Sequence, residues 1–304
     1  MKKIVFTGAC SAIPTPFNSS GVNYTVLRDF ITFQLKNSVD AIVVCGTSGE
    51  SATMSFSEKL KVISFVVDVV NHKVPVIAGT GSNNTLDAIE LTKKAEQLGV
   101  DSVLVVTPFY NKTSQSGLVK HYSAIADSTN LPIILYNVPS RTGLNISPDT
   151  CFELSKISNI VAIKEASGDI SQITKIRQLC DDDFNIYSGN DDQIIPILSV
   201  GGIGVISVLS NVVPNFVHDM VFDYLNGNIY DALTKELLAL PFINSLFCDV
   251  NPIPLKYVMS KINFDFGIPR LPLIEASSKS KKLIDDELSK FLKNISQWKR
   301  LLSF

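Results

Sequence analysis

The chain has 304 residues, of which 45% are hydrophobic and 18% are charged, and its formal net charge at pH 7 is −2. This length fits one large α/β barrel with an appendage as well as it fits two domains. Lysine and arginine are scattered along the chain, so no basic patch predicts nucleic-acid binding. No apolar run approaches the roughly 18 residues that a membrane-spanning helix needs. Composition and charge therefore argue against nucleic acid and membrane as partners.

The cysteines and histidines predict neither disulfide bonds nor a metal site. The five cysteines are widely spaced and include no C-x-x-C pair. His72, His121 and His218 fall in distant segments, without the spacing of a metal-ligand set. The N-terminal apolar segment, residues 4–6, is shorter than the about 7–15 residues that a signal peptide requires. We therefore expect a protein of the reducing cytoplasm that holds no metal.

Short apolar runs recur along the first two thirds of the chain, and each is typical of a buried strand. The segments between them carry helix signals. Ser55 and Glu58 form a capping box before an apolar stripe, and Asn84 or Thr85 can cap another helix, which Gly99 can end. We expect strands near Ala9–Ile13, Ala41–Val44, Val74–Ala78, Ser102–Val106, Pro132–Tyr136, Ile160–Ile163, Asn185–Tyr187 and Gly204–Ser207.

Strands that alternate regularly with helices predict a parallel sheet. Eight such strands favour a closed barrel over an open sheet, and no G-x-G-x-x-G motif follows the first strand. After about residue 212 the alternation stops, and four helical stretches follow near 212–225, 229–248, 252–262 and 279–302. We therefore expect an α/β protein with a (β/α)8 TIM barrel over residues 1–225, which carries the catalytic site, and a small C-terminal helical region over residues 226–304.

Lys164 is the most informative single residue. It follows the apolar run Ile160–Ile163 and precedes the polar segment Glu165–Asp169. A lysine at the edge of a low-dielectric core loses hydration, which favours the neutral amine that a Schiff-base nucleophile needs. From this segment alone, a lysine that extends to solvent or pairs with Glu165 is the more common arrangement.

Polar residues at other strand ends favour the catalytic interpretation, because a (β/α)8 barrel builds its active site there. The turn Gly46–Gly49 can aim N–H and hydroxyl groups at a carboxylate. Tyr136 ends the fifth strand and can transfer a proton, and Arg141, in a polar loop beyond it, can bind a second carboxylate. Each of these features also has a non-catalytic interpretation: an ordinary glycine-rich turn, a tyrosine packed in the core, or an arginine exposed to solvent. Tyr110, in the loop after the fourth strand, can serve only to anchor that loop. Together, around one strand-end lysine, they indicate a catalytic site.

Three motifs carry a resemblance to a known family: G-T-S-G-E at 46–50, Y-N-V-P-S-R-T-G at 136–143 and I-K-E-A-S-G-D at 163–169. With V-I-A-G-T-G at 76–81 and G-V-I-S-V at 204–208, the chain resembles the dihydrodipicolinate synthase and N-acetylneuraminate lyase superfamily over essentially its whole length. Members are pyruvate-dependent class I aldolases with (β/α)8 barrels. The chain most resembles the synthase branch, which implies condensation of pyruvate with L-aspartate-4-semialdehyde, toward diaminopimelate and lysine, without a cofactor.

The resemblance also implies catalytic roles. Lys164 would form the imine with pyruvate. Tyr136, Thr47 and Tyr110 would form a proton relay, with Tyr110 reaching in from a neighbouring subunit. Relatives are commonly tetramers assembled from tight dimers, and some are dimers. We therefore expect a homo-oligomer, and favour a tetramer built as a dimer of dimers.

Substrate-binding roles follow from the same resemblance. The backbone of Thr47 and Ser48 would hold the pyruvate carboxylate, and Arg141 would bind the carboxylate of the semialdehyde. Gly189 and Ile206 would contribute carbonyl groups near the substrate. Ser48 stands where many relatives have a second threonine, and it keeps both the hydroxyl and the N–H group.

A larger departure concerns the site at which lysine inhibits some relatives. Regulated members have histidine or another large aromatic, histidine, glutamate and tyrosine where this chain has Phe56, Lys59, Asp87 and Phe109. Lys59 would place a positive charge near the ammonium groups of the ligand, although Ser51, Ala52 and Asn83 are retained. We expect weak or absent inhibition by lysine.

Two other functions remain open. The first is another pyruvate-dependent aldolase, such as N-acetylneuraminate lyase or a 2-keto-3-deoxy sugar acid aldolase. Arg141 argues against it, because a sugar polyol calls for neutral hydrogen-bonding groups. The second is a non-catalytic sensor that binds a keto acid, and the intact set of Lys164, Tyr136 and Thr47 argues against that.

Overall fold

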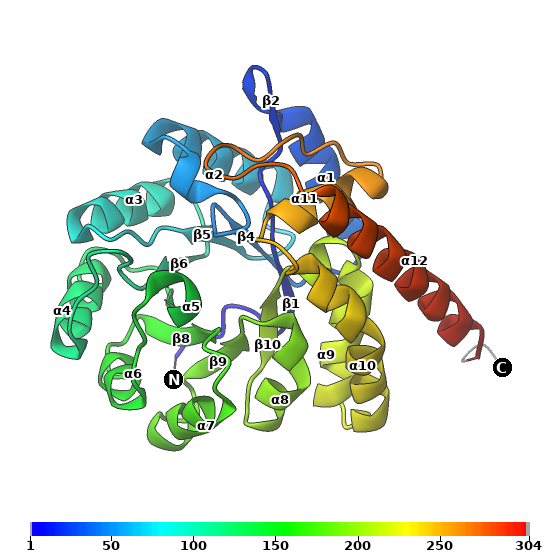
Figure 1. Ribbon diagram of the computed structural model, residues 1–304. Coiled ribbons are helices and arrows are strands. Elements are labelled where there is room, and N and C mark those ends of the chain that lie inside the picture. Colours follow the sequence, from blue (N-terminus) through cyan, green and yellow to red (C-terminus); the bar gives the residue numbers. More distant parts are fainter. Residues whose placement is uncertain (1, 302–304) are drawn as a thin grey trace.

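The computed structural model describes residues 2–301, with side chains through residue 296. Its central feature is a closed barrel of parallel strands in the order β1-β10-β9-β8-β7-β6-β5-β4, surrounded by helices (Figure 1). The expected (β/α)8 fold is confirmed. The strands are β1 (Gly8–Ala12), β4 (Ala41–Val44), β5 (Val76–Gly79), β6 (Ser102–Val106), β7 (Ile133–Asn137), β8 (Ile160–Glu165), β9 (Asn185–Ser188) and β10 (Gly204–Ser207).

One helix follows each barrel strand on the outside, in chain order α1, α2, α3, α4, α6, α7, α8 and α9, and a short helix, α5, follows β7 directly. The capping box is confirmed, because Ser55 Oγ accepts from the N–H of Glu58 while the Glu58 carboxylate accepts from that of Ser55. Asn84 caps α3. The bounds are α1 (Tyr24–Lys36), α2 (Phe56–Val70), α3 (Thr85–Gln97), α4 (Gln115–Ala126), α5 (Pro139–Thr142), α6 (Pro148–Ser155), α7 (Ile170–Leu179), α8 (Ile194–Ser199) and α9 (Pro214–Leu225).

Three further helices follow in the described part of the chain: α10 (Ile229–Leu246), α11 (Ile253–Lys261) and α12 (Ser278–Leu301). Helix α10 packs against α9 and α12, and α11 with the connection that follows it turns back over the β1–β4 side of the barrel (Figure 1). A two-stranded hairpin that the sequence did not predict, β2 (Phe17–Asn18) with β3 (Gly21–Val22), contacts the connection between α11 and α12, where the N–H of Phe17 donates to the carbonyl of Phe266 at 3.0 Å. Residue 302 of the last expected helix lies outside the described residues.

The barrel strands separate two apolar layers. An outer layer fills the space between the strands and the helices. An inner layer fills the barrel itself, where strands contribute residues such as Val43, Leu104 and Ile206, and the segment before β1 adds Phe6, whose ring stacks on Tyr187 with 4.3 Å between centroids. The interior of the barrel is therefore a packed core and not a pore.

A β-bulge in β8 sets which side chains face the inside of the barrel. The register with β7 shifts there, so that Ile133 pairs with Ile160 while Ile134 pairs with Ala162. As a result the consecutive residues Val161 and Ala162 both belong to the inner layer. The bulge reverses the alternation of the strand beyond it, as bulges beside active sites commonly do.

Among residues 2–301, none of the helices combines the length and the apolar character that a membrane crossing requires. Within the same residues, no three histidine, cysteine, aspartate or glutamate side chains gather where they could share a metal ion.

Candidate active site

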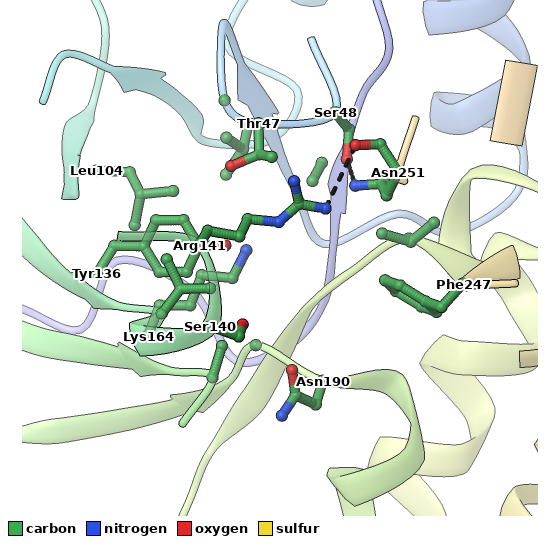
Figure 2. Close-up of a pocket in the computed structure, with 17 residues that line it drawn as sticks. Thr47, Ser48, Leu104, Tyr136, Ser140, Arg141, Lys164, Asn190, Phe247 and Asn251 are labelled. Atoms are coloured by element: carbon green, nitrogen blue, oxygen red, sulfur yellow. Dashed lines mark hydrogen bonds between the residues drawn. The ribbon is translucent and has the colours of Figure 1, made fainter. Parts of the chain in front are cut away.

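A pocket of about 180 Å³ lies at the carboxyl end of the barrel (Figure 2). Six of the residues predicted from the sequence line it: Thr47, Ser48, Tyr136, Arg141, Lys164 and Gly189. They come from strand ends and from the segments that follow them, which are far apart in the chain, so the fold brings them together as the strand-end argument predicts. Four further polar or aromatic lining residues were not among the predicted site residues: Ser140, Asn190, Phe247 and Asn251.

Lys164 lies at the floor of this pocket and is only 6% exposed. It sits beside Tyr136 on the neighbouring strand, and its Nζ lies 4.3 Å from the centre of the tyrosine ring. The tyrosine, 7% exposed, belongs to the inner layer of the barrel. A primary amine and a phenol therefore share one small, mostly enclosed space, where the amine can meet a carbonyl compound and the phenol is close enough to exchange protons with the adduct.

Glu165 does not pair with Lys164, so that alternative was wrong. Its side chain lies on the other face of β8, fully buried, where it accepts hydrogen bonds from Asn137 Nδ2 at 2.9 Å and from the Ser167 N–H at 2.9 Å. Gln172 on α7 donates to the same carboxylate at 3.2 Å. Burial raises the pKa of Glu165, against these hydrogen bonds. This hydrogen-bond network fixes the end of β8 on the face opposite to the pocket. The amine of Lys164 is therefore not paired with Glu165 and faces the pocket.

The turn Gly46–Gly49 is bounded by two residues in the left-handed region, Cys45 with φ 56° and Glu50 with φ 54°. Such conformations cost free energy for residues other than glycine, and they cluster at functional sites. Within the turn, the N–H groups of Gly49 and Glu50 donate to the carbonyls of Gly46 and Thr47. Cys45 is buried, and burial raises the pKa of its thiol to about 12, so Cys45 packs as a small neutral side chain.

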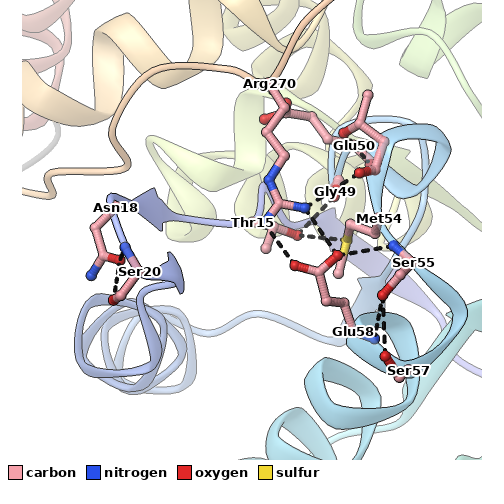
Figure 3. Close-up of polar contacts among 11 residues, drawn as sticks. Thr15, Asn18, Ser20, Gly49, Glu50, Met54, Ser55, Ser57, Glu58 and Arg270 are labelled. Carbon is pink, nitrogen blue, oxygen red and sulfur yellow. Dashed lines mark hydrogen bonds and ion pairs between the residues drawn. The ribbon is translucent and has the colours of Figure 1, made fainter.

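The C-terminal segment holds this turn from outside (Figure 3). Lys256 on α11 forms a buried ion pair with Glu50, with Nζ 2.6 Å from Oε1. Arg270 donates from its backbone N–H to the other oxygen of Glu50 and binds Glu58 through both ends of its guanidinium group. These hydrogen bonds lower the pKa of Glu58 to about 2. Burial lowers the pKa of Lys256, although Glu50 opposes that shift.

Gly189 needs to be glycine for steric reasons. A Cβ atom at this position would lie 2.7 Å from the Cβ of Ala166 and 3.1 Å from Cε of Lys164. The next loop is fixed by Asp191, which is buried and accepts from the hydroxyl of Ser207 and from the N–H of Val208 at 2.9 Å. Burial raises the pKa of Asp191.

Two predicted residues do not line the pocket. Ile206 is buried in the inner layer of the barrel, and Val208, two residues further on, reaches the pocket instead. Tyr110 lies in the loop between β6 and α4, with φ 68°, and is 91% exposed. Within this one chain, therefore, the side chain of Tyr110 is separate from Lys164.

Arg141 lies in the short helix α5, not in the loop that the sequence predicted. The helix is anchored by Thr142, whose hydroxyl accepts from Thr107 Oγ1 at 3.1 Å. The guanidinium group extends across the pocket above Lys164, and its Nη2 donates to the backbone carbonyl of Asn251 at 3.3 Å (Figure 2).

Asn251 and Phe247 come from the α10–α11 connection, about 200 residues after the turn that they face. Asn251 Nδ2 donates to Ser48 Oγ at 3.0 Å. No local pattern identified either residue, because Pro252 and Pro254 mark only a break between helices. Only the three-dimensional return of the C-terminal segment brings them to the pocket.

Comparison with known proteins assigns the family. Residues 5–291 match the model of the dihydrodipicolinate synthetase family. This range includes both the barrel and most of the C-terminal helices. The chain belongs to the dihydrodipicolinate synthetase family.

Individual relatives agree with this assignment. The 4-hydroxy-tetrahydrodipicolinate synthase 1 of Clostridium acetobutylicum is 53% identical over 284 residues, which are 93% of this chain and 97% of that protein. The structure of the 4-hydroxy-tetrahydrodipicolinate synthase of Methylacidiphilum fumariolicum superposes with a TM-score of 0.96 at 38% identity, covering 98% of this chain and 99% of that one. A structure described as a monomeric dihydrodipicolinate synthase variant has a TM-score of 0.93 at 40% identity, covering 94% and 97% of the two chains.

The buried Glu50–Lys256 pair generates a prediction about stability. Glu50→Gln keeps the size of the side chain but leaves the buried ammonium without its counter-charge, so we expect the free energy of unfolding to fall by about 3 kcal/mol. Denaturant unfolding of the two proteins measures this difference. As a control, Lys281→Met removes the solvent-exposed pair with Glu275 and should change the free energy by less than about 0.5 kcal/mol. Equal effects of the two substitutions would contradict the role given to Glu50.

Proposed function

We propose that this protein is a 4-hydroxy-tetrahydrodipicolinate synthase, which joins pyruvate to L-aspartate-4-semialdehyde through an imine on Lys164. The single observation that carries the proposal is the amine of Lys164, buried at the floor of the barrel-end pocket against Tyr136. Membership of the dihydrodipicolinate synthetase family supports it, as do the names of the relatives.

The first half of the reaction activates pyruvate. The neutral amine of Lys164 attacks the keto carbon, water leaves, and an imine forms. The imine withdraws electrons from the adjacent methyl group, which then loses a proton to give a nucleophilic enamine. Tyr136 and Thr47 line the same pocket and provide hydroxyl groups that can move these protons without free water. We assign the pyruvate carboxylate to the turn that contains Thr47 and Ser48, which lines the pocket, and Gly189 leaves room beside the lysine side chain.

The second half uses the acceptor aldehyde. The enamine carbon attacks the aldehyde carbon, and Tyr136 can supply the proton that the new alkoxide needs. Arg141 at the pocket mouth suits the carboxylate of the acceptor, because a guanidinium group binds a carboxylate through two parallel hydrogen bonds. The amino group of the acceptor then attacks the imine carbon, which closes the ring and releases Lys164. A sugar acceptor would have no use for this guanidinium group.

For the assembly, we propose a homo-oligomer in which Tyr110 completes the site of a neighbouring subunit. The tyrosine is almost fully exposed on a loop with Phe109, which supports a position in an interface. A second exposed apolar stripe on α10, formed by Ile229, Leu233 and Leu237, supports a further interface and hence a tetramer. We propose the cytoplasm as its location, in agreement with five cysteines that are all free.

The proposed reaction is tested by pyruvate consumption with L-aspartate-4-semialdehyde as acceptor, beside N-acetylmannosamine. We expect turnover with the semialdehyde only, and a loss of more than about 10³-fold in Lys164→Ala because the nucleophile is gone. Lys175→Ala, which removes an exposed lysine on α7, serves as the control and should keep full activity. Turnover with the sugar would assign the protein to the lyases. Equal turnover of Lys164→Ala and the wild type would refute the mechanism.

The cross-subunit role of Tyr110 predicts complementation. Tyr110→Phe and Lys164→Ala should each be poorly active alone, with a loss of about 10²-fold or more for Tyr110→Phe. In mixed dimers one site combines an intact Lys164 with the partner's intact tyrosine, so co-expression should restore about a quarter of wild-type activity. Mixed dimers that form but stay inactive would contradict this arrangement, as would a fully active monomer.

The residues at the expected inhibitor site predict a weak response to lysine. Lys59 is half-buried beside the exposed Phe56, and Asp87 lies exposed on the first turn of α3. A cation at Lys59 repels the ammonium groups of a lysine ligand, so we expect little inhibition of the synthase rate at sub-millimolar L-lysine. Strong inhibition in that range would show that the site works despite these substitutions.

A further inference from the structure

The positive charge of the proposed pyruvate adduct has no counter-charge in the pocket lining. Lys164 is buried, so an iminium ion on its nitrogen puts a cation inside the end of the barrel. Among the described residues, the lining adds the cation of Arg141 and contains no aspartate or glutamate. A charge in a low-dielectric interior needs a compensating charge or strong hydrogen bonds. Any protein anion that stabilises the adduct must therefore lie behind the pocket wall.

Asp191 lies directly behind that wall. It is 2% exposed and is not part of the lining, although Asn190, the residue before it, is (Figure 2). Its carboxylate accepts from the hydroxyl of Ser207 and from the N–H groups of Val208 and Leu209, both at 2.9 Å. Because Val208 also lines the pocket, the carboxylate lies between two segments that form the wall, one after β9 and one after β10.

The same wall contacts the side chain of Lys164. Strand β9 pairs with β8, and Tyr187 stands opposite Lys164. At Gly189, two residues before Asp191, a Cβ atom would lie only 3.1 Å from Cε of the lysine. The carbon that bears the amine therefore packs against the backbone that leads into Asp191.

The hydrogen bonds of Asp191 suit a carboxylate and not a carboxylic acid. Two of its partners are N–H groups, which can only donate. The third is the hydroxyl of Ser207, whose oxygen already accepts from the N–H of Ser210 at 2.8 Å, so that its proton is directed at Asp191. Burial raises the pKa of Asp191, whereas these hydrogen bonds and the positive charge of Lys164 lower it. The charges of Asp191 and Lys164 therefore interact across the wall.

We propose that the buried carboxylate of Asp191 is the counter-charge for the iminium ion that Lys164 forms with pyruvate. The inference rests on the proposed function and adds a positioning residue to it, one that acts through Lys164 and does not contact the substrate. In this step the amine adds to the keto carbon, and the keto oxygen leaves as water. That water takes one proton from the nitrogen and one from the surroundings, and the nitrogen keeps one proton and the positive charge.

The charge on this nitrogen drives the next step. A base removes a proton from the methyl group, the C–H electron pair forms the C=C bond of the enamine, and the C=N electron pair returns to the nitrogen. A neutral imine withdraws electrons less strongly, so an anion that keeps the nitrogen protonated favours the enamine. Because Asp191 lies behind the wall, it does not pair with Arg141, which stays available for the carboxylate of the acceptor.

Other ionisable groups around this pair are differently placed. Tyr136 and Arg141 line the pocket. Cys10 on β1 is fully buried, and burial raises the pKa of its thiol, so it stays neutral. Glu236 on α10 accepts from N–H groups at the start of α8, and burial raises its pKa to about 7. Asp192 is exposed to solvent.

The test measures the protonation of the adduct nitrogen directly. Protein labelled with ¹⁵N in its lysines is mixed with pyruvate labelled with ¹³C at the keto carbon, and ¹³C–¹⁵N correlation NMR selects the C=N group of the adduct. Its ¹⁵N shift, followed against pH, gives the midpoint at which the iminium ion loses its proton. Removing the anion disfavours the charged form, so in Asp191→Asn we expect the midpoint to fall by about one pH unit or more.

Three further variants make the result specific. Asp191→Ser, a smaller neutral side chain, should also lower the midpoint and repeats the test where Asp191→Asn folds poorly. Asp191→Glu keeps the charge and should stay close to the wild-type midpoint. Asp40→Asn is the matched control: it makes the same change at the amino end of the barrel, where Asp40 accepts from the N–H of Ala9 at 2.7 Å, and should leave the midpoint unchanged.

An adduct whose midpoint is unchanged in the neutral Asp191 variants would overturn the inference and make Asp191 a support for two loops only. An equal fall in Asp40→Asn would also overturn it. If the wild type gives no adduct signal, the imine on Lys164 is wrong, and the proposed function and the inference fail together. These results are distinguishable, because the first two require an adduct in the wild type.

Discussion

Burying the amine of Lys164 inside an apolar barrel is the constraint on which the rest of the site depends. A charged amine in a low-dielectric interior is costly, so the lysine can be tolerated only where the barrel opens to a polar pocket. The bulge in β8 turns this residue inward, and the buried Glu165 network holds the opposite face of the strand. A strand that kept strict alternation from Ile160 would place Glu165 inside and Lys164 outside. One inserted residue thus decides which ionisable group faces the pocket.

The C-terminal helices belong to the same argument. The buried ion pair of Glu50 with Lys256 joins α11 to the strained turn that follows β4. Arg270 adds a hydrogen bond from its backbone N–H to Glu50 and binds Glu58 with its guanidinium group. Just before α11, Asn251 enters the pocket. The segment beyond the barrel therefore both braces the turn that contains Thr47 and Ser48 and completes the wall opposite to Lys164.

Much of the fold could be predicted from the sequence, because parallel barrel strands are buried on both faces and appear as short apolar runs. Three strands, including Ala41–Val44, have the bounds that we expected. Strands β7 and β8 run further than predicted, since Asn137 and Glu165 are polar and find partners on the helix side that no local pattern reveals. Helix α5 is four residues long and stands where the sequence predicts a loop.

The pocket was predictable only in part. Lys164, Tyr136 and the turn at Thr47 follow strands directly, so their positions depend on local pattern and on the geometry of the barrel. The bulge is invisible in an apolar run, where every residue suits either face. The position of Asn251 in the pocket depends on the return of the chain to Ser48 after about 200 residues, and no local sequence pattern predicts such a return.

The most direct test of the central claim is to locate the imine. The protein is incubated with pyruvate, reduced with borohydride, digested, and mapped by peptide mass spectrometry. We predict that the reduced pyruvate adduct is on Lys164 and that pyruvate is required for it. An unmodified Lys164 beside a labelled lysine elsewhere, or no adduct at all, would contradict the role of the buried amine.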